Sequence, residues 1–204
     1  MNTVTTETKS RPILFSTEMV KAILDGRKKT QTRRIVKTPK DFGEMRDVFD
    51  DDYLNSHGFI AIDTSIGHGF KVRCPYGKVG DVLWVRETWR VDDYNSSETI
   101  YKADIPDEIL SDIKGVAKWK PSIFMPRTAS RITLEITNIR VERLQDITEV
   151  DAKAEGVQEG DDWLDFCLGQ KHFAELWDKI NEKRGYSWAS NPFCWVLSFK
   201  RLKP

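Results

Sequence analysis

The segment from Gly26 to Arg34 holds the residues of this chain whose types and spacing best suit chemistry. It reads Gly-Arg-Lys-Lys-Thr-Gln-Thr-Arg-Arg, with five cations, two hydroxyls and no acidic residue after the glycine. Clustered cations attract anions such as phosphates. A lysine can take the proton of a threonine hydroxyl if neighbouring cations lower the lysine pKa from about 10.4 toward neutrality. The segment therefore predicts an anion-binding turn with a candidate base and nucleophile, although an ordinary basic turn before a strand has the same composition.

A second basic stretch, residues 114–131, interleaves cations with aromatic residues. It holds five lysines or arginines and no acid. Its candidate nucleic-acid contacts are Lys118, Lys120, Arg127 and Arg131. Cations beside aromatic rings are typical of single-stranded nucleic-acid binding, although a packed surface loop with extended lysines explains them equally well. Acidic stretches at 47–52 and 149–165 bring the formal net charge to zero. The basic stretches either form local positive patches on the surface or lie beside the acidic stretches in the folded chain.

The strand predicted over residues 82–87 supplies a third candidate set. Trp84 and Arg86 share one strand face, opposite Glu87. A tryptophan there could stack on a base, or it could belong to the core. Glu87 could accept a hydrogen bond from an exocyclic amine, as acids do with cytosine.

Composition limits the class of protein. The chain has 204 residues, 39% of them hydrophobic, so it can bury a substantial core. No apolar run reaches the roughly 18 residues of a membrane span, and no secretory signal is visible. Three distant cysteines favour reduced thiols in the cytoplasm. His57, His68 and Cys74 match no zinc spacing, so we expect neither metal nor cofactor. We also expect a monomer.

The periodicity of apolar residues predicts an α+β fold, mainly β. Residues 1–11 are predicted to be a disordered lead-in, and residues 12–204 a single domain with insertions near 40–57 and 94–115. The sequence predicts strands at 12–15, 32–37, 59–62, 69–73, 82–87, 100–103, 130–136 and 193–202. It predicts helices after Thr17 and Thr148, then a longer one burying Phe166, Phe173, Leu176, Trp177 and Ile180. Residues 40–52 are predicted as a loop. Few helices among many strands, with a bulge expected at Thr137-Asn138, indicate a closed or half-closed barrel.

These stretches together resemble the ASCH domain family, a branch of the PUA-like fold, in its longer phage and prophage versions. The resemblance rests on residues 12–16, 26–34, 80–89, 121–131 and 147–157. It implies a PUA-like pseudo-barrel with a few helices packed at its ends and a cleft suited to RNA or a modified nucleoside. Some members of this family are amidohydrolases that deacylate acetylcytidine, and others bind or cleave RNA.

The resemblance also implies roles for particular residues. The family pattern places an acidic or hydroxyl residue three positions after a lysine, and an arginine two positions later; Lys29, Thr32 and Arg34 match it. The chain has one extra residue here, which makes Lys28 a rival to Lys29. The amidohydrolase branch adds a glutamate on a downstream helix, matched by Glu155. These likenesses imply Lys29 as base, Thr32 as nucleophile and Glu155 as proton shuttle.

Three functions stay open at this stage. The first is a hydrolase acting on an acylated nucleoside, or a ribonuclease. The second is a non-catalytic RNA-binding module, and the third is a phage protein that binds a host protein through the same surface. The predicted substrate or nucleic-acid contacts are Arg27, Lys28, Arg33, Arg34, Trp84, Arg86, Glu87, Lys118, Lys120, Arg127 and Arg131.

Overall fold

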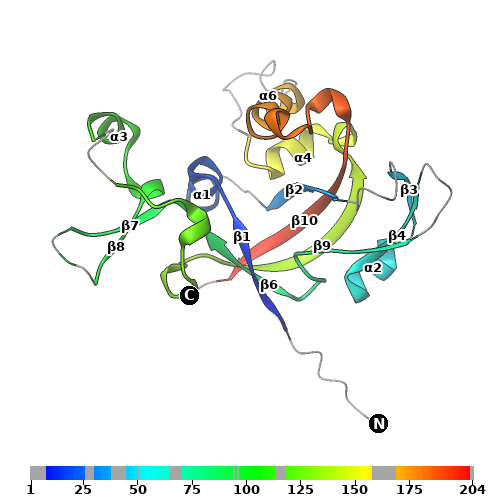
Figure 1. Ribbon diagram of the computed structural model, residues 1–204, viewed down its shortest axis with the longest axis horizontal. Coiled ribbons are helices and arrows are strands. Elements are labelled where there is room, and N and C mark those ends of the chain that lie inside the picture. Colours follow the sequence, from blue (N-terminus) through cyan, green and yellow to red (C-terminus); the bar gives the residue numbers. More distant parts are fainter. Residues whose placement is uncertain are drawn as a thin grey trace, which may run out of the picture. The chain divides into compact units, whose positions relative to one another are not determined.

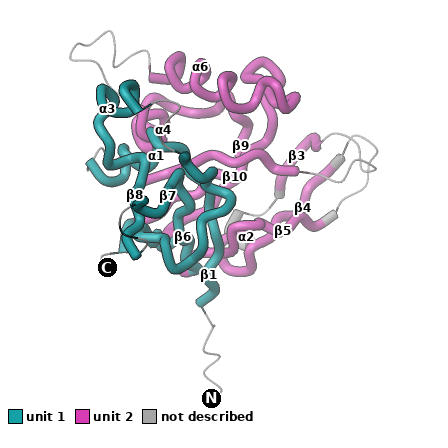
Figure 2. Tube along the Cα trace, turned by 60° about the vertical axis from the view of Figure 1, so that its left-hand side comes forward, with its two compact units in different colours: residues 1–27, 81–135, 201–204 teal, residues 28–80, 136–200 magenta. Residues whose placement is uncertain are grey.

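A computed structural model confirms that the chain is α+β (Figure 1). It describes residues 8–25, 30–37, 45–49, 51–64, 70–93, 95, 97–113, 118–157 and 169–202. Ten β-strands and five α-helices lie within these residues. The chain forms two compact units, coloured separately in Figure 2. Unit 1 comprises residues 1–27, 81–135 and 201–204, and unit 2 comprises residues 28–80 and 136–200.

Unit 1 is organised around a strand that pairs on both sides. Strand β1 (Ser10–Leu14) runs parallel to β6 (Val82–Arg86), and β6 runs antiparallel to the start of β9 (Thr133–Arg143). The alternation predicted for β6 is confirmed, because Leu83 and Val85 are buried while Trp84 and Arg86 are half-buried. Unit 1 also holds helix α1 (Thr17–Leu24), the hairpin β7 (Trp89–Val91) with β8 (Thr99–Tyr101), and helix α3 (Asp107–Asp112).

Unit 2 places two helices beside a strand pair. Strand β2 (Gln31–Ile35) is antiparallel to β10 (Phe193–Leu202), with Thr32 opposite Leu197. Helices α4 (Glu149–Ala154) and α6 (Gly169–Asn181) follow β9 in the chain. Their core cluster consists of Leu144, Ile147, Ala152, Phe173, Trp177 and Cys194. A separate sheet contains β3 (Met45–Phe49), β4 (Phe59–Thr64) and β5 (Phe70–Arg73), with helix α2 (Asp51–His57) between β3 and β4 in the chain.

The sheets of the described residues are open. The largest has the strand order β1-β6-β9-β10-β2, so β1 and β2 are its edge strands. Strand β9 is long enough to contribute to both units, and its predicted change of phase is confirmed. Ile136 and Ile139 are both buried, whereas Thr137 and Asn138 between them are exposed. Beyond the change, the N–H of Ile139 donates to the side-chain oxygen of Asn55 at 2.8 Å.

Three predicted local features are wrong. Residues 40–52 are not simply a loop, because β3 and the start of α2 lie there. Ser16, rather than Thr17, caps α1, because its hydroxyl accepts the N–H of Met19. In α6, Leu176 and Ile180 are 37% and 42% exposed. The prediction is confirmed for Phe173 and Trp177, which are buried, lie four residues apart and therefore share a face. Phe166 lies outside the described residues.

No described helix has the length and apolar character to traverse a bilayer.

Candidate functional site

A backbone hydrogen bond in unit 2 connects the two sequence motifs that the resemblance singled out. The N–H of Thr30 donates to the carbonyl of Ala154 at 3.0 Å. Thr30 directly follows Lys29 in the chain, and Glu155 directly follows Ala154. The carbonyl of Thr30 in turn accepts the N–H of Phe199 at 2.8 Å. The chain that leaves the cationic segment is therefore held on both sides, next to the end of α4.

Helix α4 presents Glu155 at its C-terminal end. The helix begins after Thr148, as the sequence predicted, and Thr148 forms a capping box with Asp151. The helix ends at Ala154, and Gly156 adopts φ +86°, a left-handed conformation that suits glycine after a helix. Glu155 is only 7% exposed in this position. A carboxylate near a helix C-terminus is disfavoured by the helix dipole, so a buried Glu155 requires a cation beside it.

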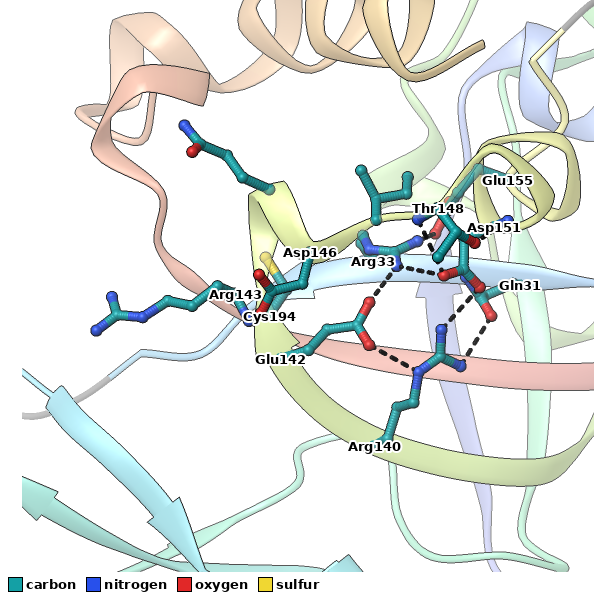
Figure 3. A network of polar contacts seen from close by, with 12 residues as sticks. Gln31, Arg33, Arg140, Glu142, Arg143, Asp146, Thr148, Asp151, Glu155 and Cys194 are labelled. Atoms are coloured by element: carbon teal, nitrogen blue, oxygen red, sulfur yellow. Dashed lines mark hydrogen bonds and ion pairs between the residues drawn. The ribbon is translucent and has the colours of Figure 1, made fainter. Parts of the chain in front are cut away.

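Arg33 is that cation. Its side chain is fully buried, and its Nη1 lies 3.3 Å from Oε1 of Glu155. Its Nη2 contacts Oδ2 of Asp151 at 3.4 Å and forms a short ion pair with Glu142 (Figure 3). The Phe173 ring centroid lies 5.9 Å from the guanidinium carbon. The rigid guanidinium can meet several carboxylates at once. This geometry favours a positioning role for Arg33 over the direct ligand contact that the sequence predicted.

Arg140 extends the same network toward solvent. Its guanidinium donates to Oε2 of Glu142 and Oδ1 of Asp151, both at 2.8 Å, and to the side-chain oxygen of Gln31 at 3.0 Å. Burial acts to raise the pKa of Asp151, but Arg140, the backbone of Thr148 and Arg33 outweigh it and lower the pKa to about 2. Asp151 is therefore ionised throughout the neutral range.

Arg34 lies on the other face of β2. Burial lowers the pKa of its guanidinium, while the charges of Tyr76 and Glu155 act in the opposite direction. Successive strand residues point to opposite faces, so Arg34 shares its face with Thr32 and not with Arg33.

Thr32 contributes a buried hydroxyl. Its residue is fully buried, and within the described part of the chain its Oγ1 has no hydrogen-bond partner. Buried hydroxyls without partners are uncommon in folded proteins. Thr32 is therefore a position where a further polar group would be stabilising. Arg27, Lys28 and Lys29 lie outside the described residues, so their predicted roles stay predictions.

Two residues predicted to contact nucleic acid bind each other in unit 1. Glu87 is 1% exposed and accepts two hydrogen bonds from Arg131, at 3.0 and 3.1 Å. Arg131 also donates to Asp104 at 2.7 Å, and its guanidinium carbon lies 3.9 Å from the ring centroid of Tyr101. Burial raises the pKa of Glu87, although the hydrogen bonds and charge of Arg131 act to lower it. Two carboxylates thus offset the charge of Arg131.

The other predicted contacts of unit 1 surround the half-buried Trp84. The guanidinium carbons of Arg86 and Arg127 lie 5.4 and 5.6 Å from a ring centroid of Trp84. Arg86 also donates its Nε–H to the carbonyl of Met125 at 3.0 Å. Two cations thus already lie within cation–π range of Trp84. Arg127 is exposed, and so are Lys118 and Lys120.

Sequence reasoning missed four members of the network around Arg33. Two of them, Glu142 and Asp151, bind Arg33 directly. The other two, Gln31 and Arg140, bind these carboxylates. One local signal pointed to them: Asp151 and Glu155 lie four residues apart, which places both on one face of a helix. The alternation on β9 places Arg140 and Glu142 on one strand face. Neither pattern identifies the strand against which the helix face or the face of β9 packs.

Comparison with known proteins adds no relative, because no family model, curated protein or solved structure matches the chain. Within the described ranges, no group of three or more His, Cys, Asp or Glu side chains could hold a metal ion.

Proposed function

We propose that this chain is an ASCH-type protein with a PUA-like fold that binds RNA or a modified nucleoside and hydrolyses an amide bond. The hydrogen bond from Thr30 to Ala154 carries the proposal. The family resemblance requires the cationic motif and a glutamate more than a hundred positions later to act at one site. This bond joins the residue after Lys29 to the residue before Glu155, and the ion pair of Arg33 with Glu155 gives the carboxylate a defined position.

The proposed reaction is an acyl transfer to Thr32 followed by hydrolysis. Lys29 takes the hydroxyl proton while Oγ1 of Thr32 attacks the acyl carbonyl carbon. The carbon–nitrogen bond then breaks, and Glu155 passes the proton that Lys29 has taken up to the leaving amine. Water next attacks the acyl-threonine ester and releases the carboxylic acid with the regenerated hydroxyl.

Two features of the site support these assignments. The unpartnered hydroxyl of Thr32 is not committed to a structural hydrogen bond within the described residues. Arg33 holds Glu155 through a buried ion pair, which fixes the carboxylate in one orientation.

Incubation with acylated nucleosides and with labelled RNA tests the proposal. We expect the wild-type protein to release the acyl group from acetylcytidine, and Lys29→Met and Thr32→Val to abolish release. Lys28→Met is the matched control and should keep turnover. Valine has the shape of threonine without its unpartnered hydroxyl, so Thr32→Val should not lower stability, and circular dichroism would check this. Hydrolysis retained by Lys29→Met would exclude its role, and loss in Lys28→Met alone would transfer that role to Lys28.

Non-catalytic RNA binding is the second candidate function. It is favoured by the exposed cations Lys118, Lys120 and Arg127 in a segment without acidic residues. For either function we propose a monomer acting in the cytoplasm, where unpaired cysteines stay reduced.

A further inference from the structure

We propose that residues 118–127 of unit 1 form a surface for single-stranded RNA on which Phe124 stacks against a base. We name these residues the 118–127 surface. The inference rests on the proposed function only in taking RNA as the partner. It concerns a part of the chain other than the Thr32–Glu155 site, and it does not depend on hydrolysis.

The backbone of the 118–127 surface is anchored at three points. The N–H of Lys120 donates to the carbonyl of Trp89 at 2.8 Å, and the N–H of Trp89 donates back at 3.3 Å. Arg86 donates to the carbonyls of both Ile123 and Met125. The side chain of Met125 is fully buried. Because the backbone of this segment is already held in place, little conformational entropy is lost when its exposed side chains bind a partner.

Two large apolar side chains of the anchored segment point outward. A 3-10 turn spans Ser122–Phe124, and Phe124 and Ile123 are 68% and 55% exposed. Exposed hydrophobic side chains on an ordered segment beside a buried anchor mark an interaction surface better than scattered ones do. An aromatic ring offers a flat face on which any nucleobase can stack.

Charge selects nucleic acid over protein as the partner. Residues 118–127 contain Lys118, Lys120 and Arg127, all exposed, and no acidic residue. In the part of the chain that the structure describes, none of these three cations forms an ion pair with a carboxylate, and neither does Arg86. Cations without carboxylate partners in the same short segment as an exposed aromatic ring complement a phosphate backbone with stacked bases. Arg131 is excluded from the surface, because Glu87 and Asp104 already offset its charge.

Fluorescence anisotropy with a labelled uridine 12-mer tests the inference at low salt. Stacking contacts predict that Phe124→Ala weakens binding by about 5- to 150-fold. Phe124→Leu should also weaken it, because leucine keeps the apolar volume but has no π face. The matched control is Ile109→Ala, since Ile109 is an apolar residue of unit 1 that is 49% exposed outside the surface. We expect this control to bind like the wild type.

The dependence on salt tests the cations separately. Three phosphate contacts predict a slope of about −2 for log affinity against log salt concentration with single strands. A variant with Lys118, Lys120 and Arg127 replaced by glutamine should lose most of that slope.

Several outcomes would overturn the inference. These are no RNA binding by the wild type at low salt, equal binding by Phe124→Ala, or equal affinity for duplex RNA. Absence of RNA binding together with self-association sensitive to Phe124→Ala would identify a protein interface instead. Acetylcytidine turnover by the wild type, measured in parallel, separates the two proposals. Hydrolysis without RNA binding refutes only the 118–127 surface, whereas RNA binding without hydrolysis refutes only the proposed catalysis.

Discussion

Replacing Asp151 with asparagine tests whether the network around Arg33 stabilises unit 2. The Asp151 carboxylate accepts hydrogen bonds from Gln31, Arg33, Arg140 and the backbone of Thr148. An asparagine must present its amide hydrogens to some of these donors, so it loses hydrogen bonds as well as the charge. We therefore expect Asp151→Asn to lower the free energy of unfolding.

The pKa of Asp151 sets the magnitude and the pH window. Its fall from 3.8 to about 2 corresponds to about 2.5 kcal/mol at most, since one unit of pKa is worth about 1.4 kcal/mol. The side chain is 18% exposed, and screening by solvent reduces the expected contribution to about 1–2 kcal/mol. Because the folded-state pKa is depressed, this contribution is present above about pH 4. It disappears as the pH falls from about 4 toward 2.

Urea unfolding followed by tryptophan fluorescence between pH 3 and 7 measures this difference. We expect wild type and Asp151→Asn to differ by about 1–2 kcal/mol at pH 7 and to converge as the solution is acidified. Asp112→Asn is the matched control, since Asp112 is exposed and its substitution should change stability by less than about 0.5 kcal/mol. A difference that stays constant from pH 7 to pH 3 would refute the reasoning, as would no difference at pH 7.

Two further predictions concern the buried core of unit 2. Arg33→Met should lower the free energy of unfolding by about 3–5 kcal/mol in the same urea assay, because it leaves three carboxylates without their buried cation; a loss below about 1 kcal/mol would contradict a structural role. Burial raises the pKa of Cys194 to about 12, so its thiol stays protonated and should resist iodoacetamide at pH 8 until urea unfolds the protein. Peptide mass spectrometry would measure this, and modification in native buffer would count against the buried environment.

Elements with a strong local pattern were predicted well from the sequence. The predicted strand at 193–202 coincides with β10, because a near-continuous apolar run suits a strand that packs on both faces. The start of helix α4 followed from Thr148 alone, since a cap acts within three residues.

Predictions failed where packing rather than periodicity decides the outcome. Leu176 and Ile180 are apolar and fit a helical pattern, yet they are substantially exposed, because the core meets only the face with Phe173 and Trp177. Helical spacing says which residues share a face, but it does not say how wide a face the neighbouring elements cover.

The residues of the candidate site also divide into those that the sequence indicates and those whose surroundings depend on packing. From the sequence alone came the cationic segment, the hydroxyl of Thr32 and the glutamate after α4, because residue type and local spacing are properties of the chain itself. Only the tertiary structure decided the environment of Arg33, whose carboxylate partners Glu142 and Glu155 lie 109 and 122 positions away. Contacts at such separations depend on which strand and helix pack together, and packing of elements distant in the chain has no local signature.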